Sequence, residues 1–148
     1  MEQFKNVIKN MIVLFQNLER LEQKKIDAVS KHNLTSLEET MNKEQAEILK
    51  LRGAERELYS IQKQCGWEGK TFREILLLIS GDDKKEFEEL FHQFSSAMKS
   101  FQMTNEEAKQ SLNIQIYTIN KAMQQSGIEY NDSGKLMNRK QSFTNTKI

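Results

Sequence analysis

The sequence has 148 residues, of which 37% are hydrophobic and 29% charged, and its formal net charge is +1. This length fits one domain, or one domain with a tail, and the balanced charge leaves no electrostatic footprint for nucleic acid or an anionic membrane. A single cysteine, Cys65, excludes an intramolecular disulfide and a thiolate zinc cluster.

The chain contains no proline, although average usage would give about seven. Because proline costs about 3 kcal/mol in a helix interior, its absence permits long helices. The longest apolar run near the start, Met11–Phe15, has five residues, too few for a signal peptide or a membrane span. We therefore expect a cytoplasmic protein with no stable membrane insertion and no nucleic-acid partner.

Apolar residues spaced three or four apart predict a first helix from about Glu2 to Ser30. Its seam consists of Phe4, Val7, Met11, Leu14, Leu18 and Leu21. A polar break follows, in which Asn33, Thr35 or Ser36 can cap a second helix over about 34–64. Gly66 is a natural stop for that helix, since glycine adopts the left-handed conformation without steric penalty.

Thr71 and Glu74 have the spacing of a capping box and predict a short, largely buried helix over the apolar run that follows them. Gly81 ends that helix, and Asp82 or Asp83 begins the last one, which extends to about residue 125. A polar interval near Thr104 allows either one helix of about 43 residues, near 65 Å long, or two helices joined there. We favour one helix with a local irregularity.

These elements predict an all-α fold, an antiparallel bundle of three long helices, the first two a hairpin, plus one short helix. The bundle domain is expected to cover residues 1–125. From Ser126 onward the helical pattern fails, and Asn131–Gly134 is rich in turn-forming residues. We expect residues 126–148 to form a flexible, mildly basic tail.

Residue patterns that could support catalysis are weak. Glu89 and His92 have the Glu-x-x-His spacing of di-iron bundles, but that architecture needs a second such pair, and the other histidine, His32, has Val29 in the glutamate position. Cys65 lies at a helix C-terminus, where the helix dipole disfavours a thiolate. We therefore expect no enzyme, no catalytic or metal-binding residues and no cofactor.

A binding surface is the stronger expectation. The first two helices should reach about 45 Å and the last about 65 Å, so the apolar face of the last helix extends beyond its shorter neighbours. Uncovered apolar surface of this kind tends to mark an interaction site. The residues concerned are Leu112, Ile116, Ile119 and Met123.

Five segments give the chain a resemblance to the FlgN-type flagellar export chaperones over about residues 1–134. The first two are the end of the first helix, Leu18–Val29, and the charged stretch Glu38–Leu51 of the second. Cys65–Trp67 with Thr71–Leu76 is similar to the family's short helix after a glycine. Asn105 with the Leu112 region is similar to its long last helix, which is marked by an asparagine, and Tyr130–Gly134 is similar to its closing Tyr…Gly element. The turn after Asn105, Glu106–Lys109, departs from the family pattern.

This resemblance implies a cytoplasmic chaperone that binds the terminal amphipathic helices of hook-associated proteins. It would prevent their premature assembly and deliver them to the flagellar type III export apparatus. The expected partner-binding region then runs from Leu112 to Tyr130 and includes Ile128. The alternative is a structural coiled-coil protein that self-assembles through the same apolar seam, and a homo-oligomer is possible under either interpretation.

Overall fold

The computed structural model describes residues 1–124, 128–130 and 136–138, and within them the expected helices are confirmed. Helix α1 spans Glu2–Ser30, α2 spans Leu34–Gln64, α3 spans Phe72–Leu78 and α4 spans Asp82–Met123. Two short strands follow, β1 (Ile128–Tyr130) and β2 (Leu136–Asn138). Because α1 packs along both α2 and α4, the all-α bundle with one added short helix is confirmed.

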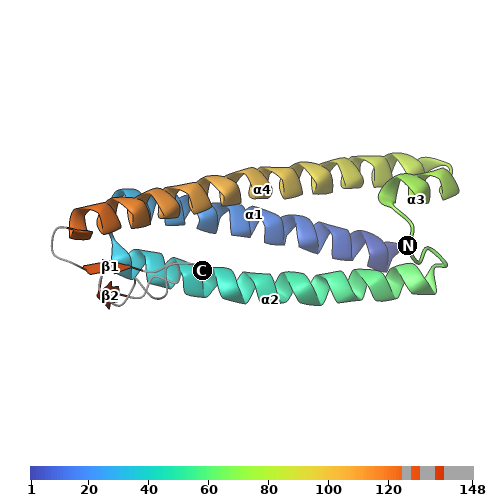
Figure 1. Cartoon of the computed structure of the whole chain (residues 1–148). Coiled ribbons are helices and arrows are strands. Elements are labelled where there is room, and N and C mark those ends of the chain that lie inside the picture. Colours follow the sequence, from blue (N-terminus) through green and yellow to red (C-terminus); the bar gives the residue numbers. More distant parts are fainter. Residues whose placement is uncertain (125–127, 131–135, 139–148) are drawn as a thin grey trace.

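The three long helices form an elongated layer with α1 between the other two (Figure 1). Helix α2 returns antiparallel to α1, and α4 runs in the same direction as α1. The backbones of α2 and α4 hardly approach one another, whereas each contacts α1 extensively. Consequently α1 buries side chains around most of its circumference, while α2 has three buried residues, Thr40, Ala54 and Ile61.

The helix ends follow the predicted capping chemistry. The side chain of Asn33 accepts a hydrogen bond from the backbone N–H of Ser36 at 3.1 Å and caps α2. Thr71 and Glu74 form the complete capping box of α3, with reciprocal bonds of 3.2 and 2.7 Å. These bonds hold the pKa of Glu74 below its usual value, because they stabilise its carboxylate form.

Two of the expectations about helices need comment. Helix α4 is continuous through Thr104, whose hydroxyl donates to the carbonyl of Ser100 at 3.0 Å. The short helix α3 is not largely buried: Ile75 is enclosed, but Leu77 is 77% exposed and Leu78 is 57% exposed. A seven-residue helix lying against the outside of a layer can bury only one of its sides.

The strands β1 and β2 pair antiparallel with Glu129 opposite Met137, and β1 contacts α4. The sequence did not predict them. The turn-forming residues Asn131–Gly134 do lie between the two strands, outside the described part of the chain. The remainder of the expected tail, with its basic residues, also lies outside it, so the predicted flexibility of 126–148 and the domain boundary at 125 stay predictions.

Both connections at the ends of the α1–α2 hairpin use the same backbone motif. At the end of α2, Gly66 has a φ of +75°, and Trp67 and Gly66 donate to the carbonyls of Gln62 and Lys63. This pair of backbone hydrogen bonds is a Schellman motif. At the end of α1 the same motif places His32 at a φ of +54°, with bonds from Asn33 to Ala28 and from His32 to Val29.

The left-handed position of His32 gives a stability prediction. A residue with a Cβ costs about 1 kcal/mol more than glycine at such a φ, whereas glycine adds entropy to the unfolded chain. We expect His32→Gly to raise the melting temperature by about 2 °C, as measured by circular dichroism. The matched control, Gly66→Ala, should lower it, because it places a Cβ in the same backbone conformation. A lower melting temperature for His32→Gly would contradict this explanation.

Candidate partner-binding surface

The two ends of the bundle are held together by different chemistry. One end, where the N-terminal halves of α1 and α4 meet α3, is an aromatic cluster centred on Phe4. The Phe4 ring lies edge-on to Trp67 at 5.3 Å and to Phe91 at 6.1 Å. Phe72 stacks on Phe91 at 4.2 Å. Phe87 and Phe91 of α4 are therefore core residues at this end, and the ring contacts fix α3 and the connector to the long helices.

An ion-pair cluster closes the rim of the aromatic end. The Lys5 ammonium lies 2.7 Å from a Glu86 oxygen, 3.3 Å from an Asp83 oxygen and 5.3 Å from the centre of the Phe87 ring. The hydrogen bond to Glu86 contributes most to raising the pKa of Lys5, and Asp83 adds to it. The start of α4 is thus positioned against the start of α1 by both charge and ring contacts.

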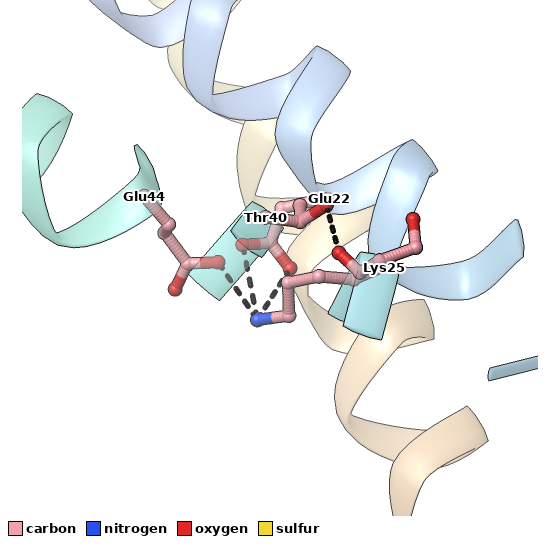
Figure 2. A network of polar contacts seen from close by, with 5 residues as sticks. Glu22, Lys25, Thr40 and Glu44 are labelled. Carbon is pink, nitrogen blue, oxygen red and sulfur yellow. Dashed lines mark hydrogen bonds and ion pairs between the residues drawn. The ribbon is translucent and has the colours of Figure 1, made fainter. Parts of the chain in front are cut away.

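The opposite half of the bundle combines buried apolar residues such as Leu18 and Leu21 with a network of polar groups. Between α1 and α2, the Lys25 ammonium lies 2.8 Å from Glu44 and 3.3 Å from Glu22. Figure 2 shows this ammonium between the two carboxylates, with Thr40 close by. Between α1 and α4, Glu19 accepts a 2.6 Å hydrogen bond from Ser100. The main cluster of buried apolar residues, by contrast, includes α1 residues from Phe4 to Phe15 and none further along the helix.

Glu22 is the most unusual member of the polar network. Its side chain is 1% exposed, and one of its oxygens, Oε2, lies 3.3 Å from the Lys25 ammonium but forms no hydrogen bond within the described part of the chain. Burial, supported by the nearby Glu44, raises the pKa of Glu22 to about 7, although Lys25 opposes the shift. Taking a carboxylate out of water disfavours its charged form, so the network holds a proton near neutral pH.

The expected partner-binding residues lie at the polar end. Leu112, Ile116 and Met123 are half-buried and Ile119 is exposed, and their spacing places all four on one side of α4. Ile128 and Tyr130 belong to β1, which contacts α4, but their side chains lie outside the description. The structure thus places the six residues on two adjoining elements. That they bind a partner stays a prediction.

The register of α1 and α4 shows how far α4 extends. Contacts join Lys5 to Asp83 and Glu86, and Glu19 to Ser100 and Thr104, so contacting residues differ by 78 to 85 positions in the sequence. Ser30, the last residue of α1, then corresponds to positions 108–115 of α4. The last two turns of α4 extend past the end of α1, as the orange end of the helix shows in Figure 1.

Two apolar residues of this region were missed by the sequence analysis. Ile114 is 64% exposed and Tyr117 is 66% exposed. They follow Leu112 by two and five positions. Because each residue turns the helix by about 100°, they lie on the side of α4 opposite to the seam that contains Leu112. In the sequence they could have been recognised as two large apolar residues, three positions apart, that do not fit the repeat of the partner-binding residues. Lys121 lies 6.0 Å from the Tyr117 ring and continues this outer side.

The other sequence-derived candidates are not drawn into a site. Cys65 is exposed at the end of α2, and the Glu89 carboxylate accepts a hydrogen bond from Gln93 rather than engaging His92. In residues 1–124 and the two strands, no group of three or more histidine, cysteine or acidic side chains could hold a metal ion. No helix in that part of the chain has the length and apolarity needed to cross a bilayer.

The raised pKa of Glu22 predicts a specific pH dependence of stability. Between the model-compound pKa of 4.5 and the folded value of about 7, the folded chain holds a proton that the unfolded chain releases. The free energy of unfolding should therefore fall as pH rises through this window and level off above it. This fall in the free energy of unfolding amounts to roughly 1–3 kcal/mol between pH 5 and pH 8. It should be absent in Glu22→Gln.

Urea unfolding at both pH values measures this difference. Asp27→Asn is the matched control, because Asp27 pairs with Lys31 on the exposed surface of the same helix. That control should retain the pH dependence of the unmodified protein. Equal pH dependence in Glu22→Gln and the unmodified protein would show that Glu22 is ionised throughout.

Comparison with known proteins adds one result. A family model described as FlgN protein matches residues 1–138, which is nearly the whole chain and includes all four helices and both strands. Searches of the curated proteins and of the solved structures found no match. FlgN is a family of flagellar export chaperones rather than of enzymes. With most of its length matched, the chain belongs to the FlgN family.

Proposed function

We propose that this chain is a cytoplasmic chaperone for hook-associated flagellar proteins and that it holds their terminal amphipathic helices against the C-terminal half of α4. Membership of the FlgN family supports the general role of a flagellar export chaperone. The observation that carries the site is the change in α4 along its length. Its first half buries Phe87, Leu90 and Phe91 against α1, whereas on its last turns, which continue past α1, Ile116 and Met123 are only half-buried and Ile119 is 37% exposed.

The geometry suits a helical client. An amphipathic helix binds a groove or seam through residues repeating every three or four positions, and Leu112, Ile116, Ile119 and Met123 repeat at this spacing. Such a helix would continue the layer beside α4 beyond the end of α1, next to β1, which also contacts α4. The client helix would then take the position next to α4 that α1 occupies further along the bundle.

The same geometry favours release. Half-buried side chains and a polar neighbouring network provide limited apolar area, and a client segment that is disordered before binding must also be ordered. Both effects keep affinity moderate for the area covered. A chaperone that hands its client to the export apparatus requires a complex of this kind, stable enough to block self-association and weak enough to be taken apart.

The proposal predicts that polar substitution on the inner side of α4, the side that carries the proposed client-binding residues, strongly weakens client binding. Leu112, Ile116 and Ile119 replaced together by serine should weaken the affinity for a hook-associated protein by roughly 100-fold or more, because buried apolar anchors dominate such interfaces. Isothermal titration calorimetry with the purified client measures the change. Undiminished affinity in a folded triple variant would place the client elsewhere.

Two comparison variants make the result specific. The double variant Leu77→Ser with Leu78→Ser removes exposed apolar side chains of α3, at the other end of the bundle, and should leave the affinity unchanged. Ile114→Ser with Tyr117→Ser tests the outer side of α4, and because both side chains are exposed these changes should cost little stability. If this outer pair, and not the inner triple, reduces binding, the client lies on the outer side and the inner assignment is wrong.

A further inference from the structure

Helix α2 has a second apolar seam that faces away from the bundle. Its inner side packs on α1 through residues such as Ala54 and Ile61. The opposite side repeats every three or four positions along the whole helix and includes four large exposed apolar residues. We call this the outer seam: Leu34, Glu38, Met41, Gln45, Leu49, Arg52, Arg56, Tyr59 and Lys63. A seam with this spacing on a straight helix is the pattern that packs against another helix.

The outer seam also carries a socket of the kind found between paired helices. Arg52, Glu55, Arg56 and Tyr59 line a surface hollow, and their spacing of i, i+3, i+4 and i+7 is that of the four residues that receive one side chain in knobs-into-holes packing. The hydroxyl of Tyr59 donates to Glu68 at 2.6 Å, which holds one wall of the hollow in place.

A matching knob lies on the same seam. Met41 is 43% exposed and precedes Leu49 by eight positions, about 12 Å along the helix. The centre of the hollow follows Leu49 by six to seven positions, about 10 Å. Two copies of α2 placed antiparallel, with a two-fold axis beside Leu49, would therefore direct each Met41 into the hollow of the other copy. Leu49, which is 66% exposed, would meet its counterpart close to the axis.

Charge on the outer seam favours the same antiparallel arrangement. Its acidic residue, Glu38, lies near the start of the helix, and its basic residues, Arg52, Arg56 and Lys63, lie in the second half. None of these four forms an ion pair within residues 1–124. Antiparallel pairing brings Glu38 of one copy between Arg56 and Lys63 of the other, whereas parallel pairing would stack like charges along the seam.

We propose that the outer seam binds a second copy of this chain and forms a two-fold symmetric antiparallel dimer through α2. The interface is isologous, as closed dimers require. This interface is separate from the apolar residues of α4 that we propose bind the client, because α1 lies between α2 and α4 in each copy. The dimer would thus carry two open client faces on its outer sides, and it does not depend on the proposed client.

Sedimentation equilibrium of the full chain tests the dimer. The average mass should rise with concentration from 17.4 kDa towards twice that value. Leu49→Glu, which buries a charge at the axis, should keep the protein monomeric over the same range. Because Leu49 is exposed in the single chain, this variant should keep its helical circular dichroism. The control Leu77→Glu, an equally exposed leucine on α3, should dimerise as the unmodified protein does.

Charge exchange tests the orientation. Glu38→Arg and Arg56→Glu should each weaken the dimer by roughly tenfold, since each places like charges at both ends of the interface. An equimolar mixture of the two variants should regain dimers, because opposite charges then meet at both ends. Failure of the mixture to regain them would exclude the antiparallel register.

A cross-link provides an independent check. With Cys65 replaced by serine, Leu49→Cys should yield a disulfide-linked dimer on oxidation, whereas Leu34→Cys should not, because Leu34 faces the far end of the other helix. Cross-linking at both positions would indicate a parallel pair and overturn the proposal. A chain that stays monomeric at every concentration would also overturn it, as would a Leu49→Glu variant that loses client binding without any change in mass.

Discussion

The structure depends on the burial of α1 between two helices that hardly touch one another. Fourteen residues of α1 are buried, against three in α2 and six in α4. Each outer helix therefore has one side committed to α1 and a wide side left over. In a compact bundle those wide sides would meet and form a common core. In this layer they remain at the surface, and on α2 that surface carries exposed apolar residues such as Met41 and Leu49.

The two ends of α1 perform different tasks because their side chains differ. Rings around Phe4 supply large buried area and edge-to-face contacts, which stabilise the end where α3 and the connector must be held. At the other end, the carboxylates of Glu22 and Glu44 are held by Lys25. A buried ion pair contributes little net stability but disfavours other alignments, because a shifted helix would leave a charge unpaired. These ion pairs thus help to keep the register of the polar end.

The sequence predicted those features that depend on neighbours within one or two turns. The bounds of α1 and α2, the cap at Asn33, the capping box at Thr71 and the stop at Gly66 all follow from local hydrogen bonding and backbone preference. Periodicity also identified one face of each helix. It could not show what covers a face, so Leu77 and Leu78 were expected to be buried and the exposed pair Ile114 and Tyr117 was missed. The positive φ of His32 was hidden as well, because no glycine marks it.

The difference in packing between the aromatic end and the polar end links the fold to the proposed activity. Local opening is easiest where few apolar side chains pack together, and the main apolar cluster ends at Phe15 on α1, short of the polar end. A client helix that packs there competes with few strong contacts and requires no rearrangement of the aromatic end. The rigid end can therefore keep α4 in place while the other end accepts and releases a client. The absence of proline contributes to this arrangement, because it lets α4 continue as one unbroken helix from the aromatic end to the end at which we propose that the client binds.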